Sequence, residues 1–271
     1  MTTYQYAFIG AGNMAKGIIG GMIHAGTQAK TIIASTQTAQ SGQQLTEQLG
    51  VINTQNNNDC LSADVIVLAV KPQILPAVLT QLDKPKMVGK LIITVIAGIP
   101  CRAYQKHLGQ SIRLVRTMPN MPAKIGLGMT GLYAINCSET DRHSADSIMR
   151  CVGKTLWLED ESHIDYVNAI SGSGPAYFYR FIHHLAEAGE KLGLSYQEAL
   201  TLAIQTAIGS AKFAEQQNDG TPDSMKNLIK QITSKGGTTF AAMQSFDKSD
   251  FATIIDQAVE DCYQRAVELG Q

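Results

Sequence analysis

The sequence predicts an α/β chain in which an N-terminal, doubly wound parallel sheet is followed by an all-helical segment. Three observations predict this. Short apolar strands alternate with helical patterns in the first part of the chain. A glycine-rich turn follows the first of these strands directly. After Trp157 no convincing strand pattern is found, and four long helical patterns follow.

The elements of the first part can be placed in order. The first two helical patterns end at a glycine, Gly26 and Gly50 respectively, which suits the left-handed end of a helix. The expected strands are Tyr4–Ile9, Thr31–Ala34, Val65–Val70, Leu91–Ile96, Ile112–Met118 and Gly128–Ala134, and the expected helices are Lys16–Ala25, Gln43–Leu49 and one that starts at Pro72. The continuous apolar runs at 65–70 and 91–96 are typical of strands that are covered on both faces.

The second part is expected to contain helices only. They cover Ala176–Lys191, Tyr196–Gln216, Pro222–Ile232 and Asp250–Leu269. Ser195 and Glu198 have the spacing of a capping box, and Thr221 precedes a proline at the first helical position. We place the boundary within Glu159–Ile164, so the predicted domains are residues 1–160 and 161–271.

The expected helix at Tyr196–Gln216 is apolar on more than one face, which indicates an enclosed helix. About 105 helical residues cannot easily enclose such a helix alone, because small domains bury a smaller share of their surface. We favour a second subunit as its cover. The alternative is that the N-terminal domain covers it.

Composition and charge exclude several classes of protein. The chain has 271 residues, 22 basic and 23 acidic side chains and a formal charge of −1, so the basic excess of a nucleic-acid binder is missing. No apolar run is long enough for a membrane helix, and no signal peptide is visible. The five cysteines have no C-x-x-C spacing, which argues against a disulfide framework and a zinc site. We therefore expect a cytoplasmic protein that acts on a small molecule.

The glycine-rich turn has the context of a dinucleotide-binding motif of Rossmann type. Gly10 allows the tight turn, and Gly12 lets the backbone approach a pyrophosphate at the start of the following helix. Ala15 stands where the third glycine often stands. The alternative is an ordinary turn between a strand and a helix. The alternation of strands and helices that follows this turn favours the dinucleotide-binding motif.

The identity of the dinucleotide follows from a missing acidic residue. An NAD site usually holds Asp or Glu at the end of the second strand. Here that place reads Ala-Ser-Thr-Gln, with Ser35 and Thr36, and no acidic residue occurs before Glu47. Hydroxyl groups can donate to a 2′-phosphate, which a carboxylate would repel. We expect NADP(H), with NAD(H) as a second candidate.

Four further segments are unusual. They read Ala69-Val-Lys-Pro72, Arg116-Thr-Met-Pro-Asn-Met-Pro122, Ser171-Gly-Ser-Gly-Pro-Ala-Tyr-Phe178 and Thr233-Ser-Lys-Gly-Gly-Thr-Thr239. Together with the glycine-rich turn, they make the chain resemble the pyrroline-5-carboxylate reductase family from about residue 5 to residue 269. The resemblance implies a Rossmann domain followed by a helical dimerisation domain, dimers that can assemble into a decamer, and NAD(P)H-dependent reduction of L-1-pyrroline-5-carboxylate to L-proline.

The resemblance also implies the site residues. Thr239 is the expected catalytic residue and hydrogen-bonds the ring nitrogen. The expected cofactor-binding residues are Gly10, Gly12, Asn13, Met14, Ser35, Thr36, Asn56, Ala69, Lys71, Pro72, Ala97 and Gly98. The expected substrate-binding residues are Met118, Asn120, Ser234, Gly236, Gly237 and Thr238. Asn120 is expected to shape the backbone. Lys235 stands where the family usually has proline.

The loop before Thr239 also fits this chemistry on its own terms. A glycine-rich turn that opens a helix exposes backbone N–H groups, which suits a carboxylate. The alternative is a plain connection between helices. Hydride transfer requires no nucleophile, because the cofactor supplies the reducing atom.

Other candidates are set aside. His183 and His184 are adjacent on a helix and are expected to point to different faces, so no metal site is predicted. Glu159–Glu161 is interpreted as a solvated turn. An alternative enzyme, a β-hydroxyacid dehydrogenase-like oxidoreductase, requires a general acid or base such as a helical lysine, which no motif here provides. A sensing module that binds NADP would leave the loop at Gly236 without a role.

Overall fold

The protein is described by a computed structural model that covers residues 4–270. The chain divides into two compact units. The first unit runs to Ser173 and includes the last turns of the chain from Cys262, and the second comprises Gly174–Asp261.

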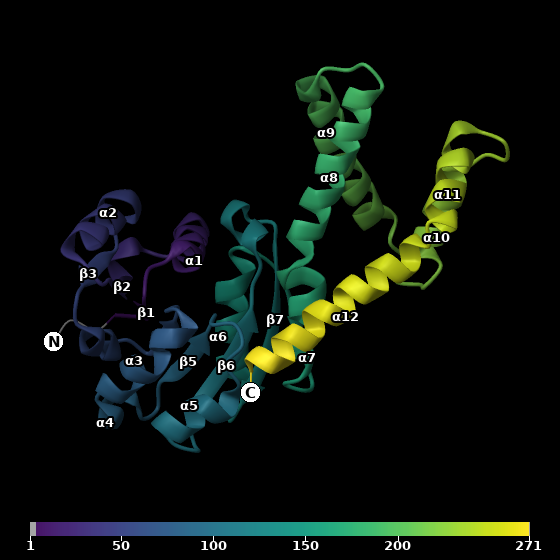
Figure 1. The fold of residues 1–271 in the computed structure, drawn as a ribbon. Helices are drawn as coiled ribbons and strands as arrows, with labels where there is room; N and C mark the ends of the chain where they lie inside the picture. Colours follow the sequence, from purple (N-terminus) through teal and green to yellow (C-terminus); the bar gives the residue numbers. More distant parts are fainter. Residues whose placement is uncertain (1–3, 271) are drawn as a thin grey trace. The chain divides into compact units, whose positions relative to one another are not determined.

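One sheet forms the centre of the first unit (Figure 1). Its strand order is β3-β2-β1-β4-β5-β6-β7-β8, and its first six strands have the order typical of dinucleotide-binding sheets. The strands are β1 (Tyr6–Ile9), β2 (Ile32–Ser35), β3 (Ile52–Thr54), β4 (Val65–Leu68), β5 (Leu91–Thr94), β6 (Arg113–Met118), β7 (Gly128–Ile135) and β8 (Gly153–Trp157).

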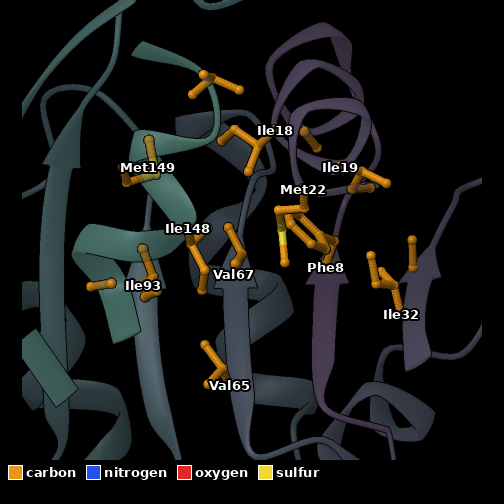
Figure 2. Close-up of a cluster of buried hydrophobic side chains, with 14 of the residues drawn as sticks. Phe8, Ile18, Ile19, Met22, Ile32, Val65, Val67, Ile93, Ile148 and Met149 are labelled. Carbon is orange, nitrogen blue, oxygen red and sulfur yellow. The ribbon is translucent and has the colours of Figure 1, made fainter. Parts of the chain in front are cut away.

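Helices cover both faces of this sheet, as expected for a doubly wound fold. Phe8 packs into one core cluster, whereas its neighbours Ala7 and Ile9 pack into the other. On the Phe8 side, α1 (Asn13–His24), α2 (Ala39–Leu49) and α6 (Glu139–Arg150) contribute side chains, some of which Figure 2 shows. On the other side the helices are α3 (Leu75–Gln81), α4 (Lys84–Met87) and α5 (Cys101–Leu108).

The prediction of a parallel sheet is correct except at one step. β6 and β7 pair antiparallel, and all other neighbouring strands pair parallel. The reason is the short connection from Met118 to Gly128, which contains only the 3₁₀ turn η4 (Met121–Ile125). A parallel crossover requires about a dozen residues or more.

The remaining elements are mainly helical. They comprise the 3₁₀ turns η1 (Ala29–Thr31), η2 (Asn57–Ser62) and η3 (Pro72–Ile74), the helix α7 (His163–Val167) and the π-helical turn η5 (Asn168–Gly172). They also comprise α8 (Gly174–Lys191), α9 (Tyr196–Gln217), α10 (Ser224–Ile232), α11 (Thr238–Lys248) and α12 (Phe251–Leu269). No helix within residues 4–270 has both the length and the apolar character that a membrane span requires.

The predicted helix starts are partly correct. The capping box at α9 is present, with the Ser195 hydroxyl and the Glu198 carboxylate each accepting the other residue's backbone N–H. Thr221 is not a helix cap, because α10 starts three residues later. Instead, the backbone N–H and the hydroxyl of Thr221 both donate to Asp219 Oδ1, at 2.9 and 2.7 Å, and this closes a turn.

Several large apolar side chains of α9 are exposed in the single chain. Only Ala199 and Ala203 of this helix are buried. Leu202, Ile208 and Phe213 are 58%, 50% and 52% exposed. This exposure agrees with the apolar faces seen in the sequence.

Candidate functional site

Gly10 directly follows β1 and lies against the carboxyl end of the neighbouring strand β4. Its φ angle is +93°, and a Cβ atom at this position would lie 2.7 Å from the backbone oxygen of Ala69. Both facts require glycine. β1 and β4 are the strands from which the chain order diverges, which is where open α/β sheets bind ligands.

The start of α1 is open and electropositive. Gly12 is the helix N-cap, no side chain caps the helix, and no acidic residue lies in its first turn. A Cβ atom at Gly12 would meet no heavy atom within 4 Å, so packing within the protein does not require glycine there. The free N–H groups of Asn13 and Met14 and the helix dipole therefore fit the pyrophosphate of a dinucleotide.

Ser35 holds the glycine-rich turn from inside the protein. Its side chain is buried, and its hydroxyl accepts from the Gly10 N–H at 3.2 Å and donates to Asn57 Oδ1 at 2.7 Å. A serine hydroxyl has one proton, so the expected donor to a 2′-phosphate already has a partner here. Asn57 was missed by the sequence analysis; the run of polar residues from Asn53 to Asn58 was the only signal for it.

Thr36 and Asn56 lie at the same edge of the sheet but differ in exposure. The buried Thr36 hydroxyl donates to the Thr38 carbonyl at 3.1 Å. The exposed Asn56 caps η2: its Oδ1 accepts from the Asn58 N–H at 3.0 Å, and its Nδ2 donates to Asp59 at 3.1 Å. The Asn56 side chain is thus fixed by neighbours close in sequence.

The other expected cofactor residues follow the next two strands. Ala69, Lys71 and Pro72 come after β4, and Lys71 is exposed. Ala97 and Gly98 come after β5, with φ at Gly98 of +74°. Because β1, β4 and β5 are parallel neighbours, these segments lie at one edge of the sheet with the start of α1.

Asn120 shapes the backbone after β6, as expected. Its Oδ1 accepts from the Met129 N–H at 2.9 Å, and its Nδ2 donates to the Ser171 carbonyl at 3.1 Å. The Met118 side chain lies against Gly172: a Cβ atom added to Gly172 would be 2.8 Å from Met118 Cε. The Arg-Thr-Met-Pro-Asn motif therefore meets Ser171 and Gly172, the first two residues of the Ser-Gly-Ser-Gly-Pro motif, within the first unit.

The interpretation of Glu159–Glu161 as a solvated turn is wrong for Glu161. Its Oε1 accepts from the Cys101 N–H at 2.6 Å and from Arg116 Nη1 at 2.7 Å. Arg116 is 4% exposed, and Asp165 lies on its other side at 3.6 Å. Burial raises the pKa of Asp165, although the Arg116 charge opposes this. A buried guanidinium requires such partners, which a turn of three acidic residues alone does not reveal.

The loop before α11 lies in the second unit and turns tightly into the start of that helix. Gly236 has a φ of +78°, and the Gly237 N–H donates to the Ser234 carbonyl at 2.9 Å. Gly237 is the N-cap of α11, and no side chain caps the helix. Thr238 and Thr239 form its first turn, and no acidic residue lies there.

His183 and His184 do not point to different faces, contrary to expectation. Their ring centroids lie 5.1 Å apart, and both rings approach Glu187. Neighbouring helical residues are rotated by about 100°, yet both imidazoles turn toward the Glu187 carboxylate.

Two family models match parts of the chain, and known proteins are similar to it over nearly its whole length. Residues 161–269 match the family model described as pyrroline-5-carboxylate reductase dimerisation, and residues 5–98 match the model described as NADP oxidoreductase coenzyme F420-dependent. The pyrroline-5-carboxylate reductase of Pseudomonas aeruginosa is 40% identical over 100% of this chain and 98% of its own length. The enzyme of Vibrio alginolyticus is 36% identical over 98% and 97%.

Solved structures show the same relationship. The pyrroline-5-carboxylate reductase of Coxiella burnetii is similar over 100% of both chains, with a TM-score of 0.91 and 35% identity. The Plasmodium falciparum enzyme with NADP bound has a TM-score of 0.86 and 27% identity over 100% of both chains. The present chain is thus an NADP-dependent oxidoreductase of proline biosynthesis, and it belongs to the pyrroline-5-carboxylate reductase family.

Proposed function

We propose that the sheet edge at Gly10, Ala69 and Gly98 holds NADP(H) for the reduction of L-1-pyrroline-5-carboxylate to L-proline. The observation that carries this proposal is the uncapped start of α1 beside Gly12, where free N–H groups face open space. The backbone after β4 and β5 then lines the nicotinamide half. When bound, NADPH supplies the hydride that reduces the imine carbon.

The loop from Ser234 to Thr239 binds the substrate. Its backbone N–H groups and the dipole of α11 suit the substrate carboxylate, and Lys235 adds a positive charge. The Thr239 hydroxyl donates a hydrogen bond to the ring nitrogen or orients it when it is already protonated. Met118 and Asn120 lie in the segment after β6 and shape the substrate side of the site.

The chain works as a homodimer, and a decamer assembled from such dimers is the alternative. Support comes from the dimerisation model that matches residues 161–269 and from the exposed apolar side chains of α9. We propose residues 161–271 as the substrate-binding and dimerisation domain. The five free cysteines fit a reducing compartment, and the cytoplasm is the proposed location.

The test follows the absorbance of NADPH after L-1-pyrroline-5-carboxylate is added to the purified full chain. We expect oxidation of NADPH and formation of proline. Parallel assays with NADP⁺ and small β-hydroxyacids test the alternative dehydrogenase and are expected to show no turnover. If NADPH stays reduced with folded, NADPH-binding protein, the proposed reaction is wrong.

A further inference from the structure

Helix α8 has three metal-ligating side chains that the reductase reaction does not use. They are His183, His184 and Glu187, and one ligand atom from each lies within 4.8 Å of the others. All three belong to one helix of the second unit. Two imidazoles and a carboxylate are donors that zinc and related divalent transition ions accept.

The two histidines converge on the one carboxylate. His183 Nε2 lies 3.4 Å from Glu187 Oε1, and His184 Nδ1 lies 2.8 Å from Glu187 Oε2. The spacings i, i+4 and i, i+3 place both side chains on the Glu187 side of the helix. A single helix-surface ion pair would require only one of the histidines.

These distances are close to those of a coordination sphere. With metal–ligand bonds of about 2.1 Å in a tetrahedron, neighbouring ligand atoms lie about 3.4 Å apart. The ligand atoms, which all lie within 4.8 Å of one another, can approach further by side-chain rotation, since the side chains are 52%, 58% and 41% exposed. No backbone movement is required.

A neighbouring side chain supports this grouping of His183, His184 and Glu187. The Tyr196 hydroxyl of α9 lies 3.5 Å from His183 Nδ1, the ring nitrogen that faces away from Glu187, and can orient that ring.

We propose that His183, His184 and Glu187 form a surface site for a divalent transition ion of the zinc class. Three protein ligands leave a fourth position, which water or another donor fills. Because the ligands span one turn of α8, the ion would link successive parts of this turn and stabilise the helix. The site is independent of the proposed reductase residues.

The test is a calorimetric titration of the full chain with ZnCl₂, after removal of any affinity tag and treatment with EDTA. We expect saturable binding of one zinc ion per chain. His184→Ala and Glu187→Gln should each weaken binding about tenfold or more. His24→Ala, which removes an unrelated helical histidine at the end of α1, is the matched control and should bind as the wild type does.

Circular dichroism of each variant shows that α8 and the rest of the chain are folded, and His184→Gln replaces His184→Ala if the latter is not. Zinc should also raise the unfolding temperature of the wild type and of His24→Ala, but not of the ligand variants. Absence of saturable zinc binding, or equal binding in the ligand variants and the wild type, overturns the proposal.

Discussion

Glu161 accepts a hydrogen bond of 2.6 Å from the backbone N–H of Cys101, a residue 60 positions earlier in the chain. Cys101 is the first residue of α5, so this carboxylate lies at the positive end of that helix. The same oxygen accepts from Arg116 of β6 at 2.7 Å. Glu161 therefore ties β6 to the end of the segment from β5 to α5, which contains the proposed cofactor residues Ala97 and Gly98.

Replacing Glu161 should disturb cofactor binding more than the chemical step. In Glu161→Gln, the buried Arg116 loses a charged partner, and the segment before Cys101 loses part of its anchor. We expect KM for NADPH to rise several-fold, kcat to change by less than about twofold, and stability to fall by about 1–3 kcal/mol. Initial rates over a range of NADPH concentrations, with thermal unfolding, measure these effects.

Glu159→Gln is the control for this variant, since Glu159 is exposed two residues away. It should behave as the wild type does. An unchanged KM for NADPH in a destabilised Glu161→Gln protein would show that Glu161 serves stability alone.

Thr239→Ala tests the proposed catalytic hydroxyl. The residue lies in the first turn of α11, where alanine is favourable for the helix, so folding should be retained. Loss of one hydrogen bond to the ring nitrogen should lower kcat/KM by roughly ten- to a hundredfold. Thr239→Ser keeps the hydroxyl and should restore most of the activity. Equal rates for the alanine variant and the wild type would remove Thr239 from the mechanism.

Cofactor preference is best tested outside the part-buried hydrogen-bonded pair formed by Ser35 and Asn57. An aspartate at position 35 would face the Asn57 oxygen in a buried place and damage the fold. Gln37 is exposed two residues beyond the end of β2. We expect Gln37→Asp to lower kcat/KM for NADPH about tenfold, through about 1.4 kcal/mol of repulsion of the 2′-phosphate, and to leave NADH unaffected.

Gln37→Asn is the neutral control for this substitution. If Gln37→Asp and Gln37→Asn give the same ratio of NADPH to NADH efficiency, the 2′-phosphate lies elsewhere.

The elements predicted correctly are those with a strong local pattern. The run Val65–Leu68 is apolar on both faces, and the Ser195 capping box involves residues three apart. The edge strand β3 (Ile52–Thr54) was missed because it is short and polar. Glu161 was misjudged because nothing local distinguishes it from the exposed Glu159 and Asp160. Its partners are 45 and 60 residues away, and only the folded sheet brings them together.

The apolar surface of α9 should be required for dimerisation. Leu202 and Ile208 are 58% and 50% exposed in the single chain, so a glutamate at either place should not disturb the fold of the chain itself. In a dimer interface the same charge would be buried without a partner. We expect Leu202→Glu and Ile208→Glu to shift the protein to monomers in size-exclusion chromatography with light scattering.

Val88→Glu is the matched control for these two variants, because Val88 is 81% exposed in the first unit. It should retain the assembly state of the wild type. Wild-type assembly in both α9 variants would place the dimer interface on another surface.

Asp146 should make stability depend on pH. It accepts hydrogen bonds from Thr155 at 2.7 Å and Trp157 at 3.2 Å and pairs with Arg150. Burial alone would raise the pKa of Asp146, but these hydrogen bonds and the Arg150 charge outweigh it and lower the pKa. A lowered folded-state pKa stabilises the protein above the unfolded value of about 3.9, and this stabilisation is lost as pH falls through the folded value.

Asp146→Asn should therefore be less stable than the wild type by about 1 kcal/mol at neutral pH. The difference should shrink as the pH is lowered below about 4, because the wild-type carboxylate then takes up its proton and loses its advantage over the amide. Thermal unfolding of both proteins across this range measures it. Asp247→Asn removes an exposed carboxylate of α11 and should change stability little at any pH. A stability loss in Asp146→Asn that stays the same down to about pH 3 would mean that packing at Trp157, and not the charge of Asp146, holds β8 against α6.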